Sequence, residues 1–479
     1  MLELSRAQAM AAASILLAVA LVGLAWLARR SEGSSSGAGA KPVTGAATGV
    51  GADGWAGVGA LRLGLSQAVS AYSFWILIGV SAAAYVDGLT AAWTADGFVI
   101  GAVINALYVG RRVRRAVGQQ SLPVWLSATG TTVPDPRSQS ASPISSAHGS
   151  DAWKGNASAG AAGILLLVLF VAMVAQLRVA GSLLADALGI AVWAAVGLIG
   201  TVVAAVVFLG ERRGAIDGAA MIAVLLVPIA VLLLIPAILF AGSLGNLFDM
   251  LWMSTQPGTT GAGAGAPGLR RGVLSWLVAL LVGLALPGLP HVLDQFAAAR
   301  DERVAARAGW VTLIWLVLIT TLMLLLGWCA RVLYTGLSAD LLLVDVAERL
   351  LPPYLQALAP LAICAAVCAA LGHQLLTSAE AAAPHWVALG DPALRPKRLR
   401  RVRVILIVMA VALAAVLDFG SSRVLLFALV ALGAVVLPAL LARLAGRNWR
   451  RATVALTVRA GLILTLLLFL AGPGQRLQP

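Results

Sequence analysis

Polar side chains interrupt a long apolar segment near the start of the chain. The run at residues 65–79, LSQAVSAYSFWILIG, places Ser66, Gln67, Ser70 and Ser73 within a stretch long enough to cross a bilayer. Hydroxyl and amide groups at that depth are unfavourable unless they face other protein groups or a cavity. Backbone that unwinds inside a membrane is tolerated only in the same surroundings. The run therefore predicts a helix that is broken in mid-membrane and lines a cavity for a small solute or ion.

Two ionisable side chains also lie inside apolar segments, Asp96 and His373. An imidazole titrates near neutral pH, and a buried carboxyl group can titrate in the same range. Both residues are therefore candidates for carrying a proton through the membrane. In the alternative interpretation, Asp96 faces an outer vestibule and His373 packs near the inner mouth against Glu380.

The other chemically active side chains form no catalytic pattern. Cys364 and Cys368 lie four residues apart, as half of a metal site would, but no further Cys or loop His is near them. They are interpreted as small packing residues. The histidines and acidic residues do not show the paired spacing of an acid and a base, and the cysteines have no neighbouring base. The sequence therefore predicts a protein that is not an enzyme and holds no organic cofactor.

Composition defines the environment of these groups. Of the 479 residues, 60% are apolar and 11% are charged, against about 45–50% and about 25% in soluble proteins. This indicates a multi-pass membrane protein whose partners are the lipid bilayer and a small solute, with no particular protein partner indicated. The net charge of +14 comes from short basic loops, which argues against nucleic-acid binding. Ala-rich and Arg-rich usage is compatible with a GC-rich bacterial genome, and we expect a location in the cytoplasmic (inner) membrane.

Hydropathy predicts twelve membrane-spanning helices in a single transmembrane domain, 1–479. It divides into a first helix with its loop (1–56), a core (57–445), and a last helix with a tail (446–479). Lys and Arg gather in alternate loops, which by the positive-inside rule puts the N-terminus outside. The predicted spans lie at roughly 8–28, 57–83, 90–110, 158–180, 182–209, 217–241, 272–290, 308–334, 353–380, 403–419, 423–445 and 453–472.

Several motifs within these spans share a pattern with known proteins. Besides the run at 65–79 they comprise AYVDGL at 84–89, GAVIN at 101–105, LPVWL at 122–126, GLPHVL at 288–293, AICAAV at 362–367 and QLL at 374–376. Together these resemble the sodium/solute symporter family, most closely its bacterial sodium/proline symporters. The resemblance extends over most of the chain. It implies an all-α, LeuT-type fold in which spans two to eleven form a five-plus-five inverted repeat.

The resemblance also implies where a sodium ion would lie. In the family, backbone carbonyls of core helix one and Ser and Thr hydroxyls of core helix eight hold it. The hydroxyl positions here are Ala369 and Ala370, and the family's Asp on core helix one is Ala71. Because a dehydrated cation needs oxygen ligands, the chain is predicted to have lost family-type sodium coupling, with protons as a possible replacement. Thr377 and Ser378 would supply hydroxyls only if the alignment shifted by two helical turns. The matched sodium-site positions are Val69, Tyr72, Ala366, Ala369 and Ala370.

The substrate site of the resembling proline transporters falls on core helices one and six. Their aromatic pair before the Pro-His motif is replaced here by Val282 and Leu286, and Trp75 is the matched aromatic residue. Pro287 and Gly288, with the proline that follows, keep the helix interrupted. The implied substrate-binding positions are Ser70, Ser73, Trp75, Val282, Leu286 and Pro290.

The resulting prediction is a permease that moves a small organic solute, such as proline or another amino acid, by alternating access. The alternative is a relative that no longer transports and acts as a membrane scaffold or sensor, an interpretation favoured by the three lost oxygen ligands at positions 71, 369 and 370.

Overall fold

A computed structural model describes most of the core of the chain. The described residues are 58–117, 156–254, 285–339, 341–386, 395–417, 421–446 and 451–470, with single positions at 15, 19, 20, 22, 23 and 283. Most of the predicted first span at 8–28, and most of the span at 272–290, lie outside them. The helices are α2 (Ala60–Phe74), η1 (Trp75–Val80), α3 (Ser81–Asp87), η2 (Gly88–Ala91), α4 (Ala92–Ile104), η3 (Asn105–Val109), α5 (Gly110–Val117), α7 (Asn156–Leu188), α8 (Val192–Phe240), α9 (Leu244–Ser254), η5 (Leu286–Gly288), α11 (Pro290–Ala297), α12 (Glu302–Leu333), α13 (Leu342–Leu350), α14 (Pro353–Gln356), α15 (Leu358–Trp386), α16 (Arg395–Val416), α17 (Ser421–Leu444) and α18 (Arg451–Leu470).

The described part of the chain contains six helical segments long and apolar enough to cross a membrane. They are 75–117, 163–188, 192–240, 302–333, 353–382 and 427–444. A straight helix of 49 residues, the length of α8, would measure about 74 Å, more than twice the thickness of a hydrocarbon core. The segment bends instead at Glu211, whose φ of 46° and ψ of −138° are not helical. Two predicted spans, 182–209 and 217–241, therefore correspond to the two halves of α8.

One predicted boundary is wrong. The sequence analysis ends the fourth span at residue 180 and begins the fifth at 182, but α7 continues to Leu188 and α8 begins at Val192. Gly189 takes the turn with a φ of 66°. Gly181, where the break was placed, is helical, and a Cβ there would lie 2.3 Å from Val196 Cγ2. This glycine therefore serves the close contact between α7 and α8 rather than a turn.

The helix that carries the polar run does not unwind as predicted. It is α-helical to Phe74 and then changes to π-helical geometry over Trp75–Val80 before α3 continues it. The six-residue π segment alters the register of the faces without opening the backbone. The polar side chains are instead accommodated by bonds to neighbouring helices.

The predicted interruption near the Pro-His motif is confirmed. Residues 286–288 form a single 3₁₀ turn, Leu289 is extended with φ −67° and ψ 114°, and α11 begins at Pro290. Proline at the first position of a helix loses no hydrogen bond. The chain can therefore break and restart here while remaining buried.

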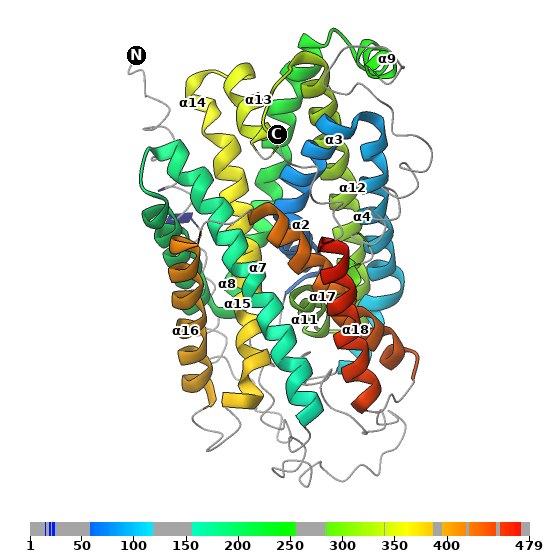
Figure 1. Cartoon of the computed structure of the whole chain (residues 1–479), viewed down its shortest axis with the longest axis vertical. Coiled ribbons are helices and arrows are strands. Elements are labelled where there is room, and N and C mark those ends of the chain that lie inside the picture. Colours follow the sequence, from blue (N-terminus) through cyan, green and yellow to red (C-terminus); the bar gives the residue numbers. More distant parts are fainter. Residues whose placement is uncertain are drawn as a thin grey trace, which may run out of the picture.

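The helices form a bundle along the long axis of the molecule, with α9, α13 and α14 at one end and α16 and α18 at the flanks (Figure 1). Helix α2 lies inside the bundle and packs against α8, α12 and α15. Helix α15 also packs against α7, and α17 packs against both α7 and η5. This arrangement brings the polar run of α2 next to the interrupted helix.

Candidate functional site

A buried hydrogen-bond network joins α2 to α11. Gln295 donates from Nε2 to Ser70 Oγ over 2.8 Å and to the carbonyl oxygen of His291 over 3.2 Å. Its Oε1 accepts a hydrogen bond from Ser66 Oγ over 3.0 Å. All four side chains are buried. Because the carbonyl of His291 can only accept, these contacts fix which end of the Gln295 amide is nitrogen.

The imidazole of His291 adds a second contact between the same helices. Its Nε2 lies 3.0 Å from the carbonyl oxygen of Ser70. A carbonyl cannot donate, so Nε2 carries the hydrogen and Nδ1 is left as the acceptor of a neutral ring. His291 Nδ1 is buried and has no hydrogen-bond partner.

Helix α15 joins the network through His373. His373 Nε2 lies 3.0 Å from Ser66 Oγ. Ser66 Oγ therefore contacts both Gln295 of α11 and His373 of α15. In the alternative interpretation of the sequence, His373 packs against Glu380. In the structure, Glu380 forms an ion pair with Arg212. The second proton candidate, Asp96, is exposed on α4 and belongs neither to this network nor to the cavity beside it.

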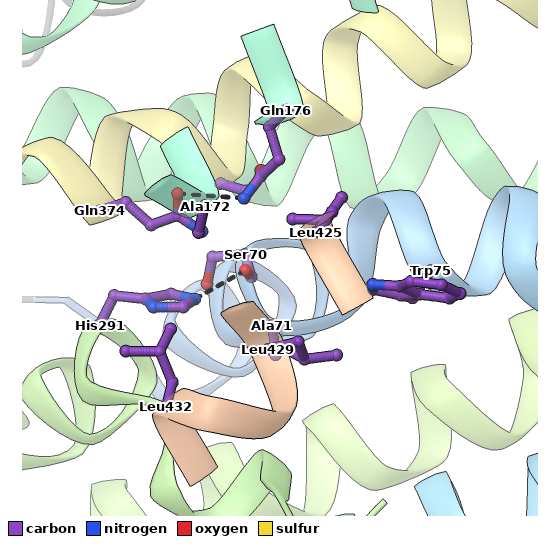
Figure 2. Close-up of a pocket in the computed structure, with 11 residues that line it drawn as sticks. Ser70, Ala71, Trp75, Ala172, Gln176, His291, Gln374, Leu425, Leu429 and Leu432 are labelled. Carbon is purple, nitrogen blue, oxygen red and sulfur yellow. Dashed lines mark hydrogen bonds between the residues drawn. The ribbon is translucent and has the colours of Figure 1, made fainter. Parts of the chain in front are cut away.

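A narrow cavity lies beside the network, between α2, α7, α11, α15 and α17. The centres of water molecules could occupy about 30 Å³ of it, which is room for roughly two waters. Figure 2 shows its polar side, where Gln176 and Gln374 face each other near Ser70. Gln176 Nε2 donates to Gln374 Oε1 over 3.1 Å. The lining residues are Ser70, Ala71, Trp75, Ala172, Gln176, His291, Ala370, Gln374, Leu425, Leu429 and Leu432.

Two of the six predicted substrate positions line this cavity, two are buried elsewhere, and two cannot be placed. Ser70 and Trp75 line it, with Trp75 on the opposite side of the labelled group from His291 (Figure 2). Leu286 and Pro290 are buried in the interrupted helix and are not among the lining residues. Val282 and the side chain of Ser73 lie outside what the structure describes.

The two glutamines, His291 and the three leucines of α17 are not among the predicted site residues. His291 and Gln374 stood in motifs that the resemblance had already matched, so a signal for them was present. Gln176 is a lone amide in the apolar span 163–188 and could have been found by the same argument that singled out Gln67. The leucines give no such signal, because any spanning helix contains them.

The matched sodium positions lie on α2 and α15, which pack against each other. Val69, Ala366, Ala369 and Ala370 are all buried, and Ala370 also lines the cavity. In an α-helix the carbonyl of residue i accepts from residue i+4, so the Val69 carbonyl is engaged within α2. The backbone of Tyr72 lies in α2, and its side chain is outside what the structure describes. Thr377 and Ser378 are buried further along α15, where the Ser378 hydroxyl contacts Met173 Sδ at 3.8 Å.

A buried charged cluster lies beyond the network. Arg212 Nη1 is 3.3 Å from Asp294 Oδ2, and Arg212 Nη2 forms an ion pair with Glu380 Oε1. The three side chains are at most 14% exposed. They come from α8, α11 and α15, so the cluster ties together three helices of the bundle.

Comparison with known proteins places this geometry in a family. A model of the sodium:solute symporter family matches residues 157–463. No curated protein sequence matches the chain. Among solved structures, a Na⁺-coupled sialic acid symporter in a substrate-bound outward-open state has a TM-score of 0.64 at 15% identity, covering 96% of this chain and 98% of that one.

Two further structures share the fold. MhsT in complex with L-phenylalanine has a TM-score of 0.55 at 13% identity, covering 87% of this chain and 99% of that one. Mhp1, a nucleobase-cation-symport-1 family transporter, has a TM-score of 0.55 at 13% identity, covering 86% and 91%. The all-α bundle is therefore a LeuT-type fold, and its relatives are transporters rather than enzymes. With the family model matching well over half of its length, the chain belongs to the sodium:solute symporter family.

Proposed function

We propose that this multi-pass membrane protein carries a small organic solute through the cavity between α2, α7, α11, α15 and α17 by alternating access, in the cytoplasmic membrane of a bacterium. The observation that carries the proposal is the position of the cavity. It lies where the interrupted helix, broken at Leu289, meets the polar face of α2. Secondary transporters bind substrate at such discontinuous helices. The resemblance to sodium/proline symporters makes proline the first solute to test.

Sodium coupling of the family type is absent in this proposal. Ala71, Ala369 and Ala370 carry no side-chain oxygen where the resemblance implies one, and the Val69 carbonyl is engaged within α2. A hard cation loses about six oxygen contacts when it sheds water and needs them replaced. Apolar methyl groups cannot replace them, so the region between α2 and α15 is a poor sodium site.

Protons are the remaining coupling candidate, and His373 is better placed than Asp96 to carry one. His373 contacts the network that links α2 to α11, so a change in its protonation would alter the bond to Ser66. Asp96 is exposed on α4 and makes no contact with that network.

Uptake by the purified protein in proteoliposomes tests the proposal. Labelled proline and a panel of other amino acids, carboxylic acids and uncharged solutes would be supplied with an inward sodium gradient, an inward proton gradient, or neither. Proton-stimulated uptake that is insensitive to sodium is expected. Sodium-stimulated uptake would overturn the coupling proposal, and His373→Gln should remove proton stimulation. Absence of uptake of every solute would overturn transport and favour the scaffold or sensor alternative.

A further inference from the structure

We infer that the solute is a small uncharged molecule that donates hydrogen bonds, rather than an amino-acid zwitterion or a carboxylate. The inference rests on the proposed function, since it names the class of solute that the same cavity would take. Three properties of the cavity lead to it: the absence of charge in the lining, the two acceptors that lack donors, and the apolar wall.

Among the residues that the structure describes, the lining of the cavity includes no Asp, Glu, Lys or Arg. The nearest charged group described above, formed by Arg212, Asp294 and Glu380, is not part of the lining, and its members pair with one another. A carboxylate or ammonium group moved from water into this cavity would have no side-chain counter-ion. Burying an unpaired charge is far less favourable than burying a hydrogen-bonded neutral group.

The start of α11 does not supply the missing positive charge. Helix N-termini bind carboxylates through free backbone N–H groups. Here Pro290 has no N–H, and the N–H groups of Val292 and Leu293 both donate to the carbonyl of Leu289, over 3.1 and 3.0 Å. The interrupted helix therefore closes its own first turn and presents neither of these amides to a solute.

Two acceptors at the cavity lack a donor. Gln176 Oε1 and His291 Nδ1 are both buried without a hydrogen-bond partner, and both residues line the cavity. The bond from His291 Nε2 to the carbonyl oxygen of Ser70 fixes the orientation of the imidazole, and Gln176 Nε2 donates to Gln374 Oε1. A protonated imidazole would lose the acceptor, but the lining holds no acidic side chain to stabilise that charge. N–H or O–H groups of a solute would satisfy both acceptors.

The opposite wall of the cavity is apolar. Leu425, Leu429 and Leu432 of α17 line it together with Ala residues, and Leu429 and Leu432 lie on the other side of Ser70 from the two amides (Figure 2). The present volume accepts about two waters, so the cavity must widen to admit any organic solute. The combination fits a compact molecule with an amide-like polar edge and an apolar ring or chain.

Three solutes with the same five-membered ring separate charge from shape: L-proline as zwitterion, 5-oxo-L-proline as anion, and 5-oxo-L-prolinamide as an uncharged N–H donor. Labelled forms of each would be supplied to proteoliposomes under the proton gradient. Uptake of the uncharged amide should exceed that of the other two by about tenfold or more, as expected of a site that selects on polar pairing. Equal or greater uptake of proline or 5-oxoproline would overturn the inference and leave the proposed function standing.

Uptake of none of the three, with uptake of a charged solute from the wider panel, would also overturn the inference alone. Uptake of nothing at all would overturn both proposals.

Substitutions in the cavity test the site itself. If the uncharged amide is the preferred solute, Gln176→Leu and Gln374→Leu should each lower its uptake about tenfold. Thr320→Val is the matched control, since Thr320 is a buried polar residue of α12 outside the cavity. Normal amide uptake in both glutamine variants, each verified as folded by size-exclusion profile, would overturn the assignment of the site.

Discussion

A single hydroxyl group connects α12 to α2. Thr312 Oγ1 lies 2.9 Å from the carbonyl oxygen of Gly64 and 3.2 Å from Gln67 Oε1. Gly64 itself allows the approach, because a Cβ there would lie 2.6 Å from the carbonyl oxygen of Ala308. This close approach of the two backbones places the threonine hydroxyl within hydrogen-bond distance of two acceptors on α2, besides the carbonyl of Ala308 in its own helix.

Replacing Thr312 by Val should therefore lower the free energy of unfolding by about 1–2 kcal/mol, since it leaves a buried acceptor unpaired. Thr321→Val on the same helix is the control. Thr321 is exposed and bonds only within α12, to the carbonyl of Val317, so its loss should change stability by less than about 0.5 kcal/mol. Thermal unfolding in detergent measures both. Equal effects of the two substitutions would show that the contact between helices contributes nothing.

Individual site residues could be predicted where a polar side chain lies in an otherwise apolar span. Ser70 and Gln67 stand out because polar atoms in an apolar span need partners, and both are buried in polar contacts. Leu425 does not stand out, because its role comes only from the position of α17. Sequence spacing along one helix cannot say which face of another helix it meets, so the apolar wall of the cavity had to come from the fold.

At the level of whole elements, α17 contacts the interrupted helix through glycine. A Cβ on Gly433 would lie 2.2 Å from Ala285 Cα, and a Cβ on Gly288 would lie 3.0 Å from Gly433 Cα. Backbone meets backbone here, as in membrane helix pairs that associate through small residues. Since Leu429 and Leu432 precede Gly433 on the same helix, this contact also positions the apolar wall of the cavity.

Gly433→Ala should force α17 away from η5, costing about 1–3 kcal/mol in overpacking and reducing uptake. Gly197→Ala in α8 is the control, because a Cβ there meets no atom within 4 Å. The control should be neutral or slightly stabilising, by less than about 1 kcal/mol. Unfolding temperature and proteoliposome uptake are the measurements. A variant at position 433 that behaves like the one at 197 would contradict the close packing.

The start of α12 depends on a charged cap. Asp301 accepts a hydrogen bond from the N–H of Val304 over 2.8 Å, and this bond, aided by Arg300, lowers the pKa of the Asp301 carboxyl below its usual 3.8. A lowered pKa means that the stabilisation is complete above pH 3.8 and is lost as pH falls through the folded-state value. Asp301→Ala should therefore unfold at a lower temperature than the parent at pH 7, and the difference should shrink below pH 3.8.

Asp301→Asn separates the cap from the charge. An Asn side chain still accepts the Val304 N–H, so this variant should keep most of the stability at pH 7 and show little of the pH dependence. Circular dichroism melts from pH 7 to pH 3 follow both variants. A pH-independent difference between Asp301→Ala and the parent would mean that the charge plays no part.

The interruption before α11 could be read from the sequence, whereas the predicted break in α2 is an instructive exception. Pro287, Gly288 and Pro290 correctly placed the interruption, because proline imposes its geometry locally. The predicted break in α2 did not occur, since Ser66 and Ser70 find partners on α11 and α15. Polar side chains can be satisfied by other helices without unwinding their own, and nothing in the local sequence distinguishes the two outcomes.

At the scale of the whole molecule, the resemblance of the motifs to the sodium/solute symporter family predicted the LeuT-type fold, and the comparisons confirm it. Hydropathy predicted twelve spans, of which the described residues contain six helical segments of spanning length. The assignment of core helices one, six and eight stays a prediction. The sequence does not indicate which conformation of the transport cycle the structure represents. The narrow cavity and the closed charge cluster on α8, α11 and α15 are properties of one conformation, and a sequence encodes all the conformations of the cycle at once.

The charge cluster gives a prediction about that cycle. The positive-inside rule predicts that Arg212 and Glu380 lie toward the cytoplasm, and we expect the helices they join to separate when the cavity opens inward. In Glu380→Gln, the buried guanidinium of Arg212 keeps Asp294 as an ionic partner but faces a neutral amide in place of the Glu380 carboxylate. We expect this to disfavour the inward-closed state by about 2 kcal/mol, a factor of about 30 in the closed-to-open ratio.

Labelling of a cysteine next to the cluster measures the shift. Ala382→Cys, in a background with the three native cysteines replaced by Ala, places a thiol at a position that is fully buried in the closed state. In inside-out vesicles, a membrane-impermeant maleimide should label it faster when Glu380→Gln is added. Glu348→Gln is the control, because Glu348 is exposed on α13 at the far end of the bundle (Figure 1). Equal labelling rates in the parent and in Glu380→Gln would mean that the ion pair does not hold the inner side closed. The barrier would then have to come from the apolar packing of α2 against α8 and α15.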